Sequence, residues 1–267
     1  MRSKRSLIRN RKGVSPAVST VIITAVTVVL VLVSGSYALQ VLQSQRAAAE
    51  FDTVQKSILT FDDAVRDIAW DQAGTRSIRF TNSYGNMRLI DGSQSFEIGL
   101  QGFDGNFIYS FTSASVKYQM PYGYGLTGSE SSYILGDESS VVTRLTDSLG
   151  QALLKDESGF TSITLSYRVR VSEVGSMVID GTDVNYVYVY LIKLNCVSSN
   201  IDAGDFNLVC RNVGLETKSY GPYNVTGAEP GVSVKFGENQ PEIAHLSLNG
   251  GDTVVFNLVV ADVRVSY

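Results

Sequence analysis

The chain shows three successive patterns of hydrophobic and polar positions, and the first is a long apolar run. Residues 14–45 contain no charged side chain and consist mostly of Val, Ile, Leu, Thr and Ala. The run exceeds the roughly 20 apolar residues that a membrane-spanning helix needs, so we expect an apolar transmembrane or filament-core helix over 14–45. Thr20, Thr24 and Thr27 share one face of this helix, where a hydroxyl can bond a backbone carbonyl one turn earlier.

Residues 46–74 show the second pattern, a single apolar stripe. Its members recur three or four positions apart: Phe51, Val54, Ile58, Phe61, Val65 and Ile68. This spacing places them on one face of an amphipathic helix, with the charged residues, including Asp62, largely off that face. Two partners are open, the domain that follows or the same helix of another subunit, and a stripe of fewer than three heptads favours the first. We expect Gly74 to stop the helix.

The third pattern, over residues 75–267, is alternation of apolar and polar residues between frequent Gly, Asn, Asp and Ser turns. The expected strands lie at 76–81, 87–90, 95–100, 107–112, 115–120, 162–171, 177–180, 186–195, 206–211, 232–236, 243–248 and 253–265. Asp91-Gly92 and Asp180-Gly181 are expected tight turns, and residues 147–155 an isolated helix. Many short strands between turns indicate an antiparallel β-sandwich-like body, with 121–140 as the expected place for a subdivision. The fold class is therefore α+β.

The charge of the chain is distributed unevenly. The whole sequence has 22 basic and 26 acidic residues, but residues 1–13 hold six of the basic ones and no acid. Residues 14–267 consequently carry 16 basic and 26 acidic side chains, a net charge of −10. This acidic balance argues against nucleic acid as a partner, because such binding requires Lys and Arg against phosphates. Basic residues before an apolar span place the N-terminus in the cytoplasm and the body outside the cell.

The junction between the basic leader and the apolar run carries a resemblance to a known family. It reads Arg11-Lys12-Gly13-Val14 and continues as SPAVSTVIITAVTVVLVLV. A short basic leader, a Lys/Arg-Gly site and a retained apolar helix resemble the class III signal peptide of archaeal type IV pilin-like proteins, which include archaellins and adhesion pilins. The resemblance implies that a prepilin-type peptidase cuts between Gly13 and Val14 and removes the leader, residues 1–13.

The same resemblance implies the function and the partners. The mature chain would pass through an assembly machinery and pack its helix against copies of itself or related pilins, as a structural or adhesive subunit of a surface filament. Two features depart from the family pattern. The fifth mature position is Val18, where bacterial type IV pilins usually have glutamate, and the body is large for a major pilin.

Two other readings of the N-terminus remain open. An uncut signal anchor would start at Met1, and ordinary signal cleavage after Ala38 would release a chain that starts at Leu39. The main alternative function is a single-pass, membrane-anchored β-sandwich that binds a surface partner or polymer. We expect no enzymatic activity, since the only histidine is His245 and no catalytic constellation accompanies it.

Four short motifs complete the candidates. A hairpin centred on residue 203 would place Cys196 opposite Cys210, as a disulfide or as two buried thiols. Asn224-Val-Thr226 is a sequon, so Asn224 is a candidate for glycosylation. Residues 123–128 match G-x-G-x-x-G but lack a surrounding βαβ pattern, which indicates a Gly/Tyr loop instead of a nucleotide site. The aspartates lack the spacing of a calcium loop, so we expect neither a metal nor a cofactor.

Overall fold

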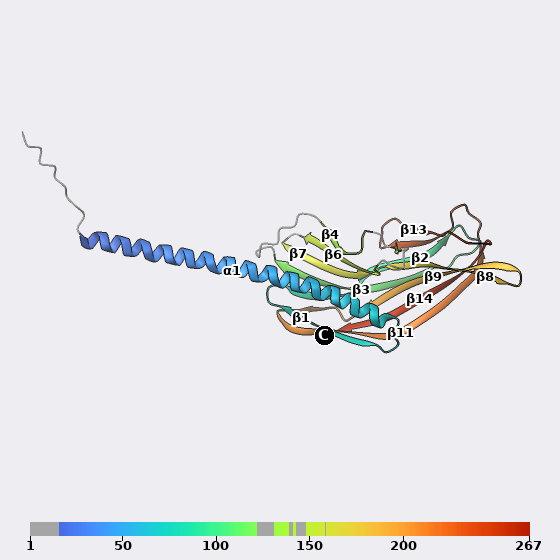
Figure 1. Cartoon of the computed structure of the whole chain (residues 1–267), viewed down its shortest axis with the longest axis horizontal. Helices are drawn as coiled ribbons and strands as arrows, with labels where there is room; N and C mark the ends of the chain where they lie inside the picture. Colours follow the sequence, from blue (N-terminus) through green and yellow to red (C-terminus); the bar gives the residue numbers. More distant parts are fainter. Residues whose placement is uncertain (1–15, 122–130, 139–140, 143–147, 158) are drawn as a thin grey trace, which may run out of the picture. The chain divides into compact units, whose positions relative to one another are not determined.

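The computed structural model describes residues 16–121, 131–138, 141–142, 148–157 and 159–267. Over these residues the chain forms one helix, α1 (Pro16–Ala69), followed by a body of strands (Figure 1). The first seven strands are β1 (Thr75–Asn82), β2 (Asn86–Gln101), β3 (Tyr109–Pro121), β4 (Ser132–Leu135), β5 (Val141–Val142), β6 (Gly150–Glu157) and β7 (Phe160–Tyr167). The others are β8 (Val169–Ile179), β9 (Thr182–Asn195), β10 (Ser199–Ile201), β11 (Gly204–Asn224), β12 (Gly231–Phe236), β13 (Glu242–His245) and β14 (Thr253–Ser266). The order of elements confirms the expected α+β fold.

The chain divides into two compact units, residues 1–46 and residues 47–267. The second unit therefore contains the amphipathic part of α1 together with all of the strands named above. Its six stripe residues are each at most 4% exposed and belong to one hydrophobic core with strand residues. The first of the two expected partners, the following β domain, is confirmed.

The strands form two sheets. One has the order β1-β11-β14-β9-β8-β5, and the other has the order β13-β12-β2-β3-β7-β6-β4, with β10 paired to β2. Most neighbours are antiparallel, as expected for a sandwich, but β14 runs parallel to β9 from Thr253 to Arg264, and β5 runs parallel to β8. The long β9–β14 ladder places the last strand in the interior of its sheet, which no local pattern predicts.

Two hydrophobic cores share the same strands. One core contains the stripe of α1 and residues of both sheets, and the other contains residues of the two sheets alone. In β9, Leu191 belongs to the second core and the next residue, Ile192, to the first; Val260 and Ala261 of β14 behave in the same way. Successive side chains of a strand point to opposite faces of the sheet. The sheet that contains β9 and β14 therefore packs against the second core with one face over the first part of these strands, and against the first core with the other face over the rest. Both cores lie in the one compact unit of residues 47–267, and the subdivision expected near 121–140 stays a prediction.

Some local predictions are confirmed and others are wrong. Asp180-Gly181, with φ of 50° and 81°, forms the expected two-residue turn, and Ile179 pairs with Thr182 across it. Asp91-Gly92 is no hairpin turn, because it lies inside β2, where the register shifts between Ile90 and Gln94. The helix expected at 147–155 is also wrong: from Gly150 the chain forms β6, and β6 pairs with β7 along its whole length.

The end of α1 depends on a residue far away in the sequence. The last helical residue is Ala69, slightly before the expected end, and Ala73 takes a left-handed φ of 65° before Gly74. The side-chain amide of buried Asn212 donates to the carbonyls of Ile68 and Ala69, at 2.9 and 2.8 Å. These bonds satisfy carbonyls that the end of a helix leaves without partners.

Candidate assembly surface

The part of α1 in the first unit presents a predominantly apolar surface. Every Val, Ile and Leu from Val18 to Leu39 is exposed in this chain. The most apolar stretch has a mean hydropathy of 2.5 and none of it is buried, so by length and composition it can cross a membrane. At 1.5 Å per residue, the thirty residues 17–46 reach further than the ~30 Å hydrocarbon core of a bilayer. Exposure of such a surface to water is unfavourable, so lipid or other helices must cover it.

Two threonine hydroxyl groups on this surface are satisfied within the helix. Thr24 donates to the carbonyl of Thr20 and Thr27 donates to that of Ile23, both at 2.8 Å. These are the bonds predicted for the threonine face. A hydroxyl bonded in this way costs little in an apolar environment, and its small side chain lets a neighbouring helix approach closely.

Within the second unit, Glu50 fastens α1 to the turn between β1 and β2. Its carboxylate accepts bonds from the backbone N–H groups of Ser83, Tyr84 and Gly85, at 2.7, 3.1 and 3.3 Å. The hydroxyl of Tyr118 donates to the same carboxylate at 2.8 Å. We call these four hydrogen bonds to Glu50 the clamp. They also explain why residue 85 is a glycine, because a Cβ on Gly85 would overlap the Tyr118 hydroxyl. Four donors on one carboxylate fix the start of the amphipathic segment on the body.

A buried ion pair lies near the other end of this segment. The Asp62 side chain is 1% exposed, and Arg66 Nε donates to its Oδ2 at 2.8 Å, while Arg66 also contacts Asp63 at the surface. Burial raises the pKa of the Asp62 carboxyl, although the nearby Arg66 acts in the opposite direction. Burial also raises the pKa of Tyr167 beside it. A Cβ on Gly150 would overlap Asp62 Oδ1, so the packing of this carboxylate requires glycine there.

Sequence reasoning missed Glu50 and Asn212, and it placed Asp62 off the buried face of the helix. Asp62 follows Ile58 by four positions and precedes Val65 by three, so it lies at the edge of the stripe. That spacing is a signal that could have identified it. Glu50 and Asn212 give no comparable signal, because their partners lie 33 to 144 residues away in the sequence.

The predicted cleavage residues lie outside the described part of the chain. Arg11, Lys12, Gly13 and Val14 all precede Pro16, where the description begins, and the G-x-G-x-x-G stretch at 123–128 lies in another undescribed segment. Cleavage between Gly13 and Val14 stays a prediction. Over the described residues, no group of three His, Cys, Asp or Glu side chains is placed to hold a metal ion.

The expected pairing of the two cysteines is wrong. Both thiols are free, and no hairpin joins their strands, because β14 lies between β9 and β11. Cys210 in β11 pairs with Val265 in β14. On the other side of β14, Arg264 pairs with Asn195 in β9, the residue directly before Cys196. Two strand spacings of about 4.8 Å each place the cysteines farther apart than the 4.4–6.8 Å between Cα atoms that a disulfide requires.

The sequon lies at the exposed end of β11. Asn224 is exposed, and its side-chain nitrogen donates to Asp104 Oδ2 at 2.8 Å, while its backbone N–H donates to Asp104 Oδ1 at 2.7 Å. These bonds lower the pKa of the Asp104 carboxyl. The amide that a glycan would modify is therefore held in place, and glycosylation stays a prediction.

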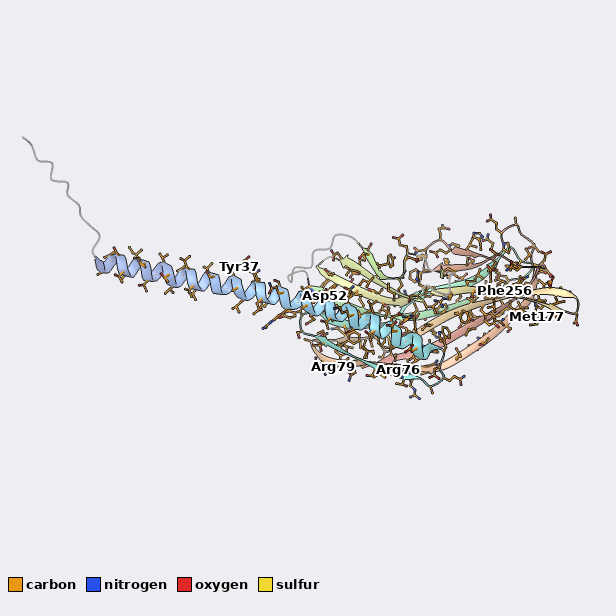
Figure 2. All side chains as sticks on the ribbon, in the orientation of Figure 1. Tyr37, Asp52, Arg76, Arg79, Met177 and Phe256 are labelled. Atoms are coloured by element: carbon orange, nitrogen blue, oxygen red, sulfur yellow. The ribbon has the colours of Figure 1, made fainter. Side chains whose placement is uncertain are left out.

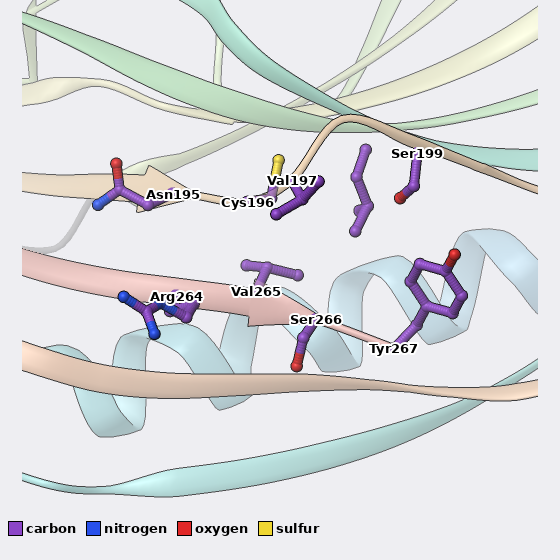
Figure 3. A pocket seen from close by; sticks show the side chains of 9 residues that line it. Asn195, Cys196, Val197, Ser199, Arg264, Val265, Ser266 and Tyr267 are labelled. Carbon is purple, nitrogen blue, oxygen red and sulfur yellow. The ribbon is translucent and has the colours of Figure 1, made fainter.

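A surface cavity of about 480 Å³ lies beside the C-terminus. Figure 3 shows residues that line it, from the chain after β9 and from the end of β14. We name it the C-terminal pocket, and its lining residues are Leu89, Asn195, Cys196, Val197, Ser199, Arg264, Val265, Ser266 and Tyr267. Its lining is mainly apolar, with one arginine, which suits an apolar group that carries a negative charge nearby.

Comparisons with known proteins leave the chain without an assigned family. No protein-family model matches the chain, and no curated protein and no solved structure matches it either.

Proposed function

We propose that this chain is a subunit of a surface filament related to archaeal type IV pili. The observation that carries the proposal is the contrast along α1: an uncharged part with every Val, Ile and Leu from Val18 to Leu39 exposed, then a part whose stripe is buried in the chain's own β body. The second part needs no other subunit to cover it. The first part needs lipid before assembly and other helices afterwards.

The mechanism of this proposal is assembly. A prepilin-type peptidase removes residues 1–13 and with them six positive charges, which otherwise hold the N-terminus in the cytoplasm. The apolar helix then leaves the bilayer and packs against the helices of neighbouring subunits. Helices in an apolar environment associate through close packing, for which the small and hydroxyl side chains at Ser19, Thr20, Thr24 and Thr27 are suited.

The β body has a separate role in the proposal. It carries the acidic surface that follows the helix, and three contacts hold it on the amphipathic segment: Glu50 on the turn after β1, Asp62 against Gly150, and Asn212 on the carbonyls at the helix end. Mechanical load on a filament would pass from the helix to the body through these contacts.

The experiment that tests the proposal is sequencing of the mature N-terminus from membranes and from sheared surface material. Val14 as the first residue supports a pilin-type signal, Met1 supports an uncut anchor, and Leu39 supports a secreted domain. A Gly13→Val variant should remain at precursor mass. The matched control is Ala38→Val, which would block ordinary signal cleavage and should leave processing unchanged.

Assembly is tested by electron microscopy of the sheared material with labelling of this chain. Labelled filaments together with a Val14 terminus agree with the proposal. A Met1 terminus on protein that stays in the membrane would contradict it and favour an anchored monomer.

A further inference from the structure

The hairpin of β8 and β9 ends in an exposed apolar tip. Residues 173–179 are all exposed, and four of them are large and apolar: Val174, Met177, Val178 and Ile179 are 63%, 60%, 65% and 42% exposed. Clustered exposed apolar residues are uncommon on a soluble surface and mark interaction sites. We call residues 174–183 the apolar hairpin.

The apolar hairpin extends beyond the sheet that carries it. The pairing of β14 with β9 begins only at Val184, and β5 pairs with β8 only at Val169 and Arg170. Among the described residues, 178–183 therefore pair only with each other, across the Asp180-Gly181 turn. A two-stranded ribbon of this kind is weakly stable alone, so a surface that covers its side chains would stabilise it.

The charge of this region is acidic. Between Val171 and Ile192 the sequence has three acidic residues, Glu173, Asp180 and Asp183, and no basic one. The hairpin thus combines an apolar tip with carboxylates at its turn and its base. A complementary surface would be an apolar recess with an arginine in its lining.

The C-terminal pocket has these properties. Val197 and Tyr267 are 84% and 63% exposed, and Leu89 and Val265 complete an apolar lining. Arg264 lines the same pocket and lies directly opposite Arg211 on the neighbouring strand β11. Among the described residues, neither arginine has a carboxylate within 4.0 Å. Like charges opposite one another on neighbouring strands are destabilising, and an added carboxylate would relieve that repulsion.

The hairpin and the pocket of one molecule lie apart on the same body. Met177 lies at one end of the β body (Figure 2), whereas the marked C-terminus lies away from that end (Figure 1). We propose that the apolar hairpin of one copy docks into the C-terminal pocket of a second copy of this chain. Such a contact leaves one hairpin and one pocket free, so it continues head to tail from subunit to subunit.

This inference deepens the proposed function, since it names a contact between bodies in the same filament. It needs no filament for its test, however, because the contact can form between full-length chains in detergent micelles. The pocket already contains a thiol, Cys196, and the other cysteine, Cys210, is buried. A cysteine on the hairpin can therefore report docking through a specific disulfide.

The experiment uses the full-length variant Met177→Cys, oxidised with copper phenanthroline at mildly alkaline pH, because burial raises the pKa of Cys196 to about 11. We expect a reductant-sensitive ladder of dimers and larger species, with the 177–196 linkage identified by mass spectrometry. Ile108→Cys, at a position 67% exposed, is the matched control and should give no linkage to Cys196. Adding Cys196→Ser to Met177→Cys should abolish the ladder.

A charge exchange tests the electrostatic part. Arg264→Glu in the Met177→Cys chain should lower the yield of the 177–196 linkage about tenfold, which corresponds to about 1.4 kcal/mol. Adding Asp183→Arg should restore a large part of that yield. The emission spectrum of Trp70, the single tryptophan, should stay unchanged and so report an intact body.

The outcomes separate this inference from the proposed function. Linkage only between two copies of residue 177, or linkage to another protein alone, overturns the docking proposal. Filaments with a Val14 terminus but without a 177–196 linkage overturn it as well and leave the filament function standing. A clear 177–196 ladder from a chain whose terminus is Met1 supports the docking and contradicts the pilin-type processing.

Discussion

Residues 17–46 and residues 47–69 belong to the same helix, yet their side chains meet different surroundings. In the first segment the apolar residues lie on all sides, those from Val18 to Leu39 are exposed, and no charge occurs before Arg46. In the second, one stripe is buried while charged residues such as Asp52 and Lys56 face outward or lie at its edge. The difference teaches that the angular distribution of apolar residues, not their number, decides whether a helix packs on its own domain or needs an external partner.

The largest expected effect tests the buried segment against the exposed one. Phe61 is fully buried and packs edge-on against Phe80, with ring centroids 6.4 Å apart. Phe61→Ala should lower the free energy of unfolding of the body by about 3–5 kcal/mol, because it removes contacts and leaves a cavity. Denaturant unfolding of the full chain in detergent, followed by Trp70 fluorescence, measures this change.

The matched control is Leu39→Ala in the exposed segment, where the side chain is 62% exposed. It should leave the unfolding midpoint of the body unchanged. Equal losses from the two variants would contradict the division of α1 into two functional segments.

A charge within the apolar segment should have the next largest effect. Val29→Arg places a cation near the middle of the span, which costs about 2.5–3.5 kcal/mol of insertion free energy. We expect a reduced membrane-integrated fraction in carbonate extraction and an unchanged unfolding midpoint for the body. Val29→Leu is the control and should remain fully integrated.

The clamp at the start of the amphipathic segment should have an intermediate effect. Glu50→Gln removes a charged acceptor that takes four hydrogen bonds, and we expect a loss of about 1.5–3 kcal/mol in the free energy of unfolding. Asp52→Asn, two positions along on the exposed side, should change stability by less than about 0.5 kcal/mol. A Glu50→Gln chain as stable as the wild type would contradict a stabilising role for the clamp.

The smallest expected effect is a pH dependence at the buried ion pair. Because the folded state raises the pKa of Asp62, the stability that this group contributes is complete below its unfolded pKa of about 3.9. It is lost as the pH rises through the raised value. Relative to wild type, Asp62→Asn should therefore gain stability as the pH increases across that interval, as measured by unfolding at a series of pH values.

Asp63→Asn is the control for that experiment, because Asp63 pairs with the same Arg66 but its side chain is 68% exposed. Solvent and salt screen a pair at the surface, so its difference from wild type should vary less with pH. A constant difference between Asp62→Asn and wild type at all pH values would contradict the raised pKa.

Several elements could be predicted because a short range of sequence contains their cause. The stripe from Phe51 to Ile68 and the Asp180-Gly181 turn are of this kind, and so are the hydroxyl bonds of Thr24 and Thr27. Each depends on positions at most a few turns or one hairpin apart. The apolar span likewise follows from composition alone.

The failures share a different cause. Residues 150–157 become β6 because β7 supplies a complete antiparallel partner, which outweighs the local helical preference. The expected hairpin between Cys196 and Cys210 fails because β14, the last strand, inserts between β9 and β11. In both cases the deciding hydrogen bonds come from another strand, and for the cysteines that strand lies more than 40 residues away.

The sequence by itself determined that an uncharged apolar helix precedes an amphipathic helix and an acidic, strand-rich body, since periodicity and charge are properties of neighbouring residues. Only the tertiary structure decided which distant groups hold the helix: Glu50 on the turn after β1, Gly150 against Asp62, and Asn212 on the carbonyls at the helix end. It also decided that the apolar hairpin and the C-terminal pocket lie apart on one body. The physical reason is that buried polar groups need hydrogen-bond partners, and the fold supplies these partners from distant parts of the chain. The local pattern of the sequence does not indicate which distant residues will become partners.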